Sequence, residues 1–443
     1  MIACVPAIAH ARDFTLADAI AYARHHQPAL AATRAELAAR RLDAHAVEGA
    51  WLPRVGATAQ LFAATANNTT GADVGVQDVA LYRISSTPAT SSTSWHPEAS
   101  TLVGIGASQE VFDFGRISAR RAIADADVSR ATDDVRAREL DLERDVEIAF
   151  YGTEAAKAVV ASAEAADRRA TVHLQLAQDG VRVGMRPVIE VKRATADLAR
   201  AHVALVRAKD NLAEARVTLA TAIGDIDEEV DTIAPTTTLP PLPALGDALA
   251  RARAASPVLA AARAELDRAR ARTHELATRL HPSLFVTASL FGMAGGATPS
   301  SGESPSGDGW VPSVANWDVG LVLSWPVFDA TVSRSEDAAR VDELARTSDI
   351  AAIDQATTGA VRDALIAAQT ADSTIASLQE SADAARANDD EAEARFTNGV
   401  GTSVELADAE ALRTDAEIQL AVGTFDQQRT RAVLAHALAQ EIP

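Results

Sequence analysis

The residues best suited to chemistry are carboxylates that follow two glycine-bearing turns. Glu405 and Asp408 lie one helical turn apart on the same face directly after the second turn, and Glu190 holds the position of Glu405 after the first. Where several copies of such a turn converge on one axis, rings of carboxylates would bind cations and set selectivity. Acidic residues are also favoured in the first turn of any helix by its macrodipole, so their spacing supports both interpretations.

Other motifs typical of catalytic sites occur without the accompanying residues that catalysis would require. Asp113-Phe114-Gly115 spells a kinase metal-binding tripeptide, but no glycine-rich loop or catalytic-loop sequence accompanies it. We therefore predict a strand-to-helix junction there, echoed by Phe328-Asp329. The histidines are scattered, and no nucleophile, base and orienting group cluster in the sequence. We expect no enzyme, no metal site and no cofactor.

The turns with the carboxylates join very long helices. From residue 117 to 179 there is no proline and one glycine, Gly152, so propensity favours one helix of roughly 95 Å. Residues 179–187 form the turn, with Pro187 in the first turn of the returning helix. That helix has a heptad seam of alternating large and small residues, which needs partner helices: Leu198, Ala201, Leu205, Ala208, Leu212, Ala215, Leu219 and Ala222.

The same plan occurs twice in the chain. Residues 31–37 return as 260–266 at an offset of 229, and Gly184 and Glu190 match Gly399 and Glu405 at an offset of 215. Each copy is predicted to contain, in this order, a short helix, a strand, a polar loop, a second strand, a very long helix, a turn and a final helix. We predict a first repeat at 12–224, an acidic and proline-rich linker at 225–245, and a second repeat at 246–440.

Four segments alternate in polarity as strands do. They lie near residues 55–61, 103–111, 284–290 and 317–327, with polar loops at 64–100 and 292–315. One apolar and one small-polar face suits a strand between lipid and water, although a half-exposed soluble sheet alternates in the same way. Trp317 and Trp325 are eight residues apart on the apolar face, roughly 26 Å along a strand, which matches two interfacial aromatic girdles.

Composition limits how the chain could meet a membrane and its partners. No stretch of 18 apolar residues exists, so a β-barrel is the one remaining way to span a bilayer. Four strands cannot close a barrel, whereas three chains would supply twelve. The net charge of −20 argues against nucleic acid as a partner. Residues 1–11 end in Ala9-His10-Ala11, which is typical of a residual signal peptide; a lipidated Cys4 is the competing interpretation.

Four short motifs, in this order and with this duplication, carry a family resemblance. They are Val-Phe-Asp-Phe-Gly-Arg at 111–116, Arg-Val-Gly at 182–184, Ser-Trp-Pro-Val-Phe-Asp at 324–329 and Arg-Phe-Thr-Asn-Gly at 395–399. Together they resemble the outer-membrane efflux proteins of the TolC type over residues 13–440. The resemblance implies a mainly α fold with a transmembrane β-barrel portion: a homotrimer with a twelve-stranded barrel in the outer membrane of a Gram-negative bacterium and an α-helical barrel in the periplasm. It also implies an exit duct for tripartite efflux or type I secretion, docked on a periplasmic adaptor and an inner-membrane pump of the RND or ABC type.

The resemblance also assigns roles to individual residues. By position, Glu405 and Asp408 look like the acidic rings of the closed periplasmic entrance, with Glu190 as the first-copy counterpart. Family members latch this entrance with a tyrosine and an arginine, but Phe396 and Gly401 stand at those positions here. Arg186 is the candidate substitute, paired to Glu190 or to a neighbouring chain. Gly184, Met185, Gly399 and Val400 resemble the adaptor contacts. The rival hypothesis is a structural periplasmic coiled-coil scaffold without a channel.

Overall fold

The computed structural model of the chain describes residues 12–64, 68–70, 74–76, 79–81, 84–88, 95, 98–226, 229–234, 239–295 and 315–440. These residues form two compact units. The sheet unit consists of the described residues of Ala38–Arg130 and Ala262–Asp349, and the hairpin unit of those of Met1–Leu37, Ala131–Ala261 and Ile350–Pro443. Each unit draws on both halves of the sequence. The expected signal peptide and Cys4 lie outside the described residues.

The two halves of the chain share one order of main elements. The first half contains α1 (Leu16–His26), α2 (Pro28–Glu48), β2 (Arg54–Ala64), β7 (Glu98–Phe112), α3 (Arg116–Arg182) and α4 (Val188–Ile223). The second contains α5 (Leu245–Ala255), α6 (Pro257–Thr278), β9 (Ser283–Gly295), β10 (Asn316–Ser324), α7 (Ala330–Thr397) and α8 (Ser403–Ala437). The long helices α3 and α7 have 67 and 68 residues, so the predicted duplication is matched in length. None of the described helices is both long and apolar enough to cross a bilayer.

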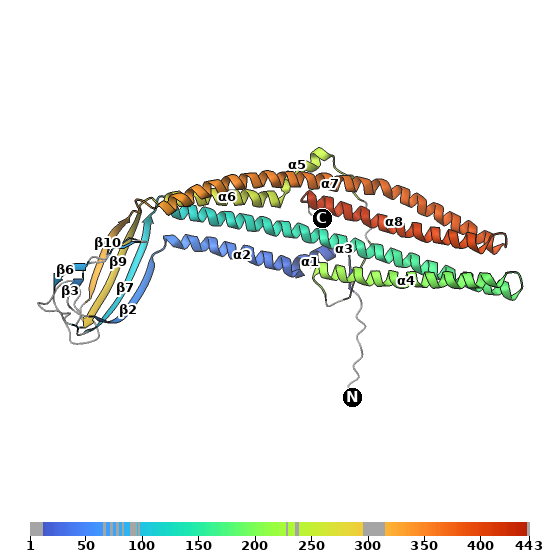
Figure 1. Ribbon diagram of the computed structural model, residues 1–443, viewed down its shortest axis with the longest axis horizontal. Coiled ribbons are helices and arrows are strands. Elements are labelled where there is room, and N and C mark those ends of the chain that lie inside the picture. The colour runs from blue at the N-terminus through green and yellow to red at the C-terminus, as the bar shows by residue number, and fades with distance from the viewer. Residues whose placement is uncertain are drawn as a thin grey trace, which may run out of the picture. The chain divides into compact units, whose positions relative to one another are not determined.

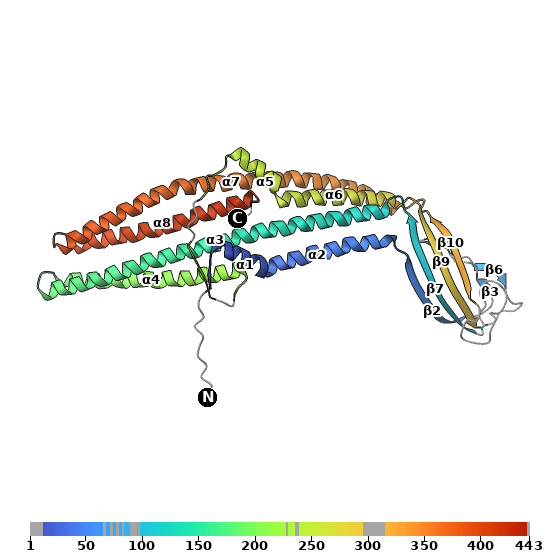
Figure 2. The same ribbon diagram turned by 180° about the vertical axis from the view of Figure 1, so that it is seen from behind.

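The hairpin unit packs its helices largely through alanine. Within it, α4 runs back along α3 and α8 runs back along α7, as both views show (Figures 1 and 2). Buried alanines recur every seven residues on α3, at Ala163, Ala170 and Ala177, so neighbouring helices can approach closely. Every position of the predicted seam on α4 is buried or half-buried. The main cluster of larger core residues comprises Phe14, Ile20, Leu30, Leu142, Val146, Phe150, Leu219, Ile223 and Val230.

The sheet unit carries one four-stranded antiparallel sheet in the order β10–β9–β7–β2 (Figures 1 and 2). Ala57, Ile105, Leu290 and Trp317 lie opposite one another across all four strands and form a row on one face. The adjoining row, on the opposite face, holds Gly56, Gly106, Ser289 and Asp318. The register therefore confirms the predicted apolar face, whereas the opposite face combines small and polar residues with apolar residues at Phe285, Phe291 and Val322.

Three strand predictions were wrong in extent. Strand β9 runs to Gly295, into the predicted loop at 292–315, because it continues to pair with β7. Strand β10 ends at Ser324 rather than 327, because Pro326 cannot donate a ladder hydrogen bond. Trp325 thus lies just beyond the strand, where its indole Nε1 donates to the Leu280 carbonyl at 3.1 Å. Both Trp317 and Trp325 are exposed, and their girdle role stays a prediction. The predicted loop at 64–100 contains the short strands β3 (Asn68–Thr70), β4 (Val74–Val76), β5 (Val79–Leu81) and β6 (Ile84–Pro88), and β7 already begins at Glu98.

A small parallel pair of strands was not predicted. β1 (Arg12–Phe14) pairs with β8 (Val230–Thr232), although the sequence predicted a short helix as the first element of the first repeat and a linker at 225–245. The Thr15 side chain accepts a hydrogen bond from the Asp18 amide and caps α1, so the helix begins at Leu16 and Phe14 enters the core.

The predicted strand-to-helix junction at Asp113 lies between β7 and α3. Both carboxylate oxygens of Asp113 accept amide hydrogen bonds at the start of α3. This end cap is what a strand-to-helix junction requires.

Candidate functional site at the hairpin turns

The two turns between long and short helices share one backbone geometry. Gly184 and Gly399 adopt φ of +75° and +73°, a left-handed conformation that suits glycine after a helix. The Met185 amide donates to the Gly180 carbonyl at 2.9 Å, and the Val400 amide donates to the Arg395 carbonyl at 3.0 Å. These are the six-to-one bonds of a Schellman motif. Below, residues 183–187 and 398–402 are called the first and the second hairpin turn.

Both hairpin turns expose apolar side chains at their ends. Met185 is 83% exposed and Val400 is 71% exposed, and the flanking apolar residues Val183, Val188, Ile189 and Val404 are exposed as well. Gly184 and Gly399 lie beside them on the surface. The structure thus places all four predicted adaptor-contact residues at the turns. Exposed apolar residues gathered in this way are typical of a protein interaction surface.

Arg186 links the first hairpin turn to the end of α7. Its Nη1 donates to Glu190 Oε2 at 3.1 Å, and its Nη2 donates to the backbone carbonyl of Phe396 at 3.0 Å. The guanidinium carbon lies 3.7 Å from the centroid of the Phe396 ring, a cation–π contact on a ring that is 3% exposed. A Cβ on Gly180 would lie 2.7 Å from Arg186 Cδ, so the glycine makes room for the side chain. Of the two partners left open by the sequence, Glu190 is in contact.

The three predicted carboxylates do not form one cluster within a protomer. Glu190 is half-buried against Arg186, whereas Glu405 and Asp408 are exposed. Glu405 Oε2 accepts from the Thr402 amide at 3.2 Å while the Thr402 hydroxyl accepts from the Glu405 amide, which is a capping box. The capping box thus gives the Glu405 side chain a structural role at the start of α8 within a single protomer. Among the described residues, no ion pair or hydrogen bond reaches the Asp408 side chain.

Gly401, which the sequence analysis placed at a predicted latch position, supports the second hairpin turn through its backbone. Its amide donates to the Arg395 carbonyl at 3.0 Å, and a Cβ there would lie 3.0 Å from the Phe396 nitrogen. A larger residue would therefore press on the end of α7. Gly401 shapes the turn and makes no latch contact itself.

Phe396 continues the contacts from Arg186 into the helices. Its ring lies edge-on to His173 of α3 with centroids 6.1 Å apart, and His173 Nδ1 lies 2.7 Å from Glu410 Oε1 on α8. Arg186, Phe396, His173 and Glu410 thus form an unbroken series of contacts between the two hairpins. The sequence did not predict His173, because the contact joins residues more than 200 positions apart.

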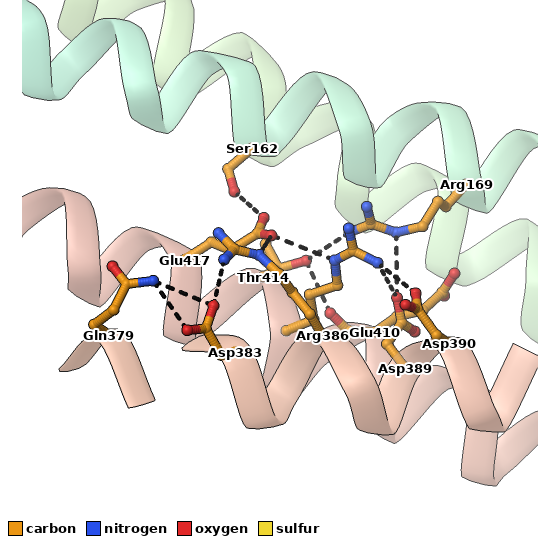
Figure 3. Close-up of polar contacts among 11 residues, drawn as sticks. Ser162, Arg169, Gln379, Asp383, Arg386, Asp389, Asp390, Glu410, Thr414 and Glu417 are labelled. Carbon is orange, nitrogen blue, oxygen red and sulfur yellow. Dashed lines mark hydrogen bonds and ion pairs between the residues drawn. The ribbon is translucent and has the colours of Figure 1, made fainter. Parts of the chain in front are cut away.

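A group of buried and half-buried polar side chains that includes Glu410 joins α3, α7 and α8 (Figure 3). We call this group the interhelix charge cluster; it consists of Ser162, Arg169, Arg386, Asp389, Glu410, Arg413 and Glu417. Arg413 Nη1 donates to Asp389 Oδ2 at 3.1 Å, and Arg169 Nε lies 3.9 Å from the same oxygen. Asp389 is 1% exposed, and this burial raises the pKa of its carboxyl despite the two arginines.

Glu417 occupies the other end of the interhelix charge cluster. Its carboxylate accepts from the Ser162 hydroxyl at 2.6 Å, from Arg386 Nε at 3.0 Å and from Arg413 Nε at 3.3 Å (Figure 3). Burial alone would raise the pKa of Glu417, but these hydrogen bonds outweigh it and lower the pKa. One carboxylate thereby ties all three helices together.

The sequence contains a signal for this cluster that was not among the predictions. On α7 the buried residues Ala382, Ala385, Asp389 and Phe396 follow steps of three, four and seven. A carboxylate within an otherwise apolar seam must find a charged partner, because an unpaired buried charge is costly. The position of Asp389 in this seam is therefore the sequence feature that would have indicated an arginine on a neighbouring helix.

Comparisons with known proteins bear on the family and the fold of the chain. The family model for outer membrane efflux proteins matches residues 19–225 and 248–440. The outer membrane efflux protein BepC of Brucella suis biovar 1 (strain 1330) is 28% identical over 211 residues, which cover 47% of this chain and 40% of BepC. The matched segment is therefore less than half of either protein.

Three solved structures share the fold. The outer-membrane channel OprN is 20% identical with a TM-score of 0.74, covering 96% of this chain and 90% of OprN. The CmeC channel of Campylobacter jejuni is 14% identical with a TM-score of 0.77, covering 96% and 85%. The MtrE channel of Neisseria gonorrhoeae, solved in its open state, is 19% identical with a TM-score of 0.73, covering 99% and 94%. With the family model matched in both halves, the chain belongs to the outer membrane efflux protein family.

Proposed function

We propose that this chain is one subunit of an outer-membrane exit duct in a tripartite efflux or type I secretion system. Three copies form a passive conduit, which a periplasmic adaptor and an inner-membrane pump open at the hairpin turns. The energy for transport comes from the pump. The chain lies in the outer membrane and the periplasm of a Gram-negative bacterium.

The four-stranded sheet carries this proposal. Val319, Leu321 and Leu323 of β10 are each exposed on its apolar face, and on the opposite face of β10 Asp318, Gly320 and Ser324 accompany one apolar residue, Val322. In the described part of the chain, the outer edges of β10 and β2 pair with no further strand. Unpaired edge amides and carbonyls are intolerable in lipid, so neighbouring copies must supply the missing strands. Three copies would close a ring of twelve.

The hairpin turns form the gate in this proposal. Glu405 and Asp408 from three copies supply carboxylate rings that attract cations. Arg186 restrains the first hairpin turn against Phe396 and thereby substitutes for the family's latch. The exposed apolar residues at both turns, Met185 and Val400 among them, receive the adaptor.

The rival scaffold hypothesis does not account for the sheet. A soluble scaffold would bury one face of a four-stranded sheet, since apolar faces of soluble sheets pack against another layer. Here the apolar face is the exposed one across all four strands. Membership of the outer membrane efflux protein family also favours the duct.

The experiment that tests the duct compares two adjacent positions on opposite faces of β9. Val286→Arg places a guanidinium on the lipid side, where it costs about 2–4 kcal/mol near the midplane. Thr287→Arg places the same group on the water side. We expect wild type and Thr287→Arg to purify from outer membranes as a detergent-requiring trimer of about 139 kDa, three times the 46.3 kDa chain, and to conduct ions in planar bilayers. Val286→Arg should fail to assemble. A wild-type monomer that is soluble without detergent and leaves vesicles impermeable would end the proposal.

A further inference from the structure

A cavity at the base of the sheet, within the sheet unit, has no role in the exit duct as described. It measures about 940 Å³ and lies where β10 and the helices α3, α6 and α7 meet. Its wall combines Arg116, Arg120 and Arg279 with Trp325, Val327 and Phe328, so one side is basic and the other is apolar.

The basic side has more guanidinium groups than carboxylates to match them. Glu275 is 1% exposed and accepts from Arg120 Nε at 3.3 Å, Arg279 Nε at 3.0 Å and Arg272 Nη1 at 2.8 Å. One carboxylate thus faces three cations. Arg120 and Arg279 use only Nε for this contact, and in the described chain their Nη groups bind no other acceptor. Both side chains are partly exposed, so these groups are available to a ligand.

The remaining charges of the cavity leave this excess in place. Arg116 is matched by Glu110, whose Oε2 accepts its Nη2 at 2.6 Å. The Asp329 carboxylate accepts from the Thr331 amide at 2.8 Å and so serves the start of α7. Even if Asp329 is counted as a full negative charge, the three carboxylates Glu110, Glu275 and Asp329 face four arginines, at positions 116, 120, 272 and 279. The basic side therefore keeps one net positive charge. The ligand that complements it is an anion.

The apolar side continues the exposed face of the sheet. Phe328 is 81% exposed and Val327 is exposed too, while Trp325 is held in place by the bond from its indole to Leu280. Tryptophan favours the boundary between lipid headgroups and hydrocarbon, where its ring is apolar and its N–H is polar. Guanidinium N–H groups bind phosphate strongly, and basic pockets beside membrane spans bind lipid headgroups. A ligand with a phosphate and an acyl chain would satisfy both sides of the cavity.

We propose that this cavity binds an anionic phospholipid of the periplasmic leaflet of the outer membrane. Arg120 and Arg279 hold the headgroup phosphate, and the acyl chain runs over Trp325, Val327 and Phe328. The proposal rests on the exit-duct function, which places the apolar face of the sheet in lipid. It adds a lipid ligand at the junction between the sheet and the helices.

Native mass spectrometry of the delipidated full-length protein in detergent tests the site. The probes are phosphatidylglycerol and, as the zwitterionic comparison, phosphatidylcholine. We expect wild type to retain phosphatidylglycerol in preference to phosphatidylcholine, and Arg120→Gln/Arg279→Gln to bind phosphatidylglycerol at least about tenfold more weakly, since two charge-assisted hydrogen bonds are lost. Arg121→Gln is the matched control, because Arg121 is exposed on the same turn of α3 and pairs with Glu48 and Asp125. The control should bind as wild type does.

A second variant keeps the test decisive if the double variant is unstable. Phe328→Ser removes an exposed ring without touching the arginines and should weaken phosphatidylglycerol binding. Equal binding by wild type, the double variant and Phe328→Ser would overturn the proposal. Competition by inorganic phosphate at concentrations similar to the lipid would overturn it as well, because the site would then be one for free anions. Trimer mass and conductance report separately on the duct, so a trimer that conducts but binds no lipid refutes only this inference.

Discussion

Glu147 offers the sharpest test of the energetics of the hairpin unit. It lies on α3, one helical turn after Glu143 and one before Tyr151. Burial, together with the charge of the nearly inaccessible Glu143, raises the pKa of Glu147 from 4.5 to about 7. Glu143 is paired with Arg24, whereas no ion pair or hydrogen bond to the Glu147 carboxylate exists among the described residues.

The sign and size of the effect follow from proton linkage. Because the folded chain binds this proton more tightly than the unfolded chain, raising the pH from about 4.5 to 7 lowers the free energy of unfolding. One pKa unit corresponds to about 1.4 kcal/mol, so the shift amounts to roughly 3 kcal/mol per chain above pH 7 and to nothing below pH 4.5. Glu147→Gln removes the ionisation and hence this cost. The variant should be more stable than wild type at pH 8 and nearly equal to it at pH 4.5.

Thermal unfolding of the detergent-solubilised protein at pH 4.5 and pH 8 measures the difference. We expect Glu147→Gln to raise Tm by an amount on the order of 5 °C at pH 8 only. Glu36→Gln is the control, because Glu36 is exposed on α2 and the chemical change is the same. An equal rise in Tm at both pH values, or no rise at pH 8, would refute the assignment of a strained buried carboxylate to Glu147.

Three further predictions concern the gate and the interhelix charge cluster. Glu405→Ala with Asp408→Ala should weaken block by di- and trivalent cations in planar bilayers, because the carboxylate rings are removed. Arg186→Ser should raise resting conductance, since the first hairpin turn loses its hydrogen bond and its cation–π contact with α7. Arg413→Ala leaves Asp389 buried without its nearest cation and should lower the stability by about 3 kcal/mol, measured as a loss of Tm.

Matched controls separate these effects from a general loss of arginine. Arg182→Ser should leave conductance unchanged, since among the described residues exposed Arg182 pairs with Asp179 on its own helix and with no other side chain. Arg429→Ala should cost about 0.5 kcal/mol, because its ion pair with Asp426 is exposed. Unchanged cation block would remove the two carboxylates from the gate. Equal conductance of the Arg186 and Arg182 variants would remove the latch, and equal losses for Arg413 and Arg429 would mean that the cluster carries little energy.

The sequence predicted the elements whose signals are long or periodic. The absence of proline and the single glycine defined α3 to within a few residues, and alternation found all four strands of the sheet. The β1–β8 pair escaped because each strand has three residues and the partners lie 218 positions apart, so no local pattern marks them. The end of β10 was misplaced because the alternation of apolar residues continues through Trp325 and Val327. The hydrogen bonds between strands, however, have already ended before Pro326.

The candidate site was predictable to the same extent. Arg186 lies in the first hairpin turn and Glu190 in the first turn of α4, four residues further on, so the two are close enough in sequence to form an ion pair, and the structure shows that contact. The contact between Arg186 and Phe396 joins residues 210 positions apart and depends on how the two hairpins pack. No periodicity in either segment encodes it. The same limit applies to His173 and to the arginines around Asp389.

Divergence between the two repeats explains why, in the part of the chain that the structure describes, the first hairpin turn contacts the second hairpin through a guanidinium and the second turn has no equivalent side chain. Gly401 occupies in the second repeat the position that Arg186 occupies in the first, at the offset of 215 that relates the two turns. A side chain at 401 would press on the backbone of Phe396, whereas Gly180 leaves space for Arg186 in the first repeat. Among the described residues, the guanidinium therefore reaches from the first hairpin to the second without a reciprocal contact. In the proposed trimer, three such contacts hold the turns, and an adaptor that docks on Met185 would act on the residue next to the arginine that must be released.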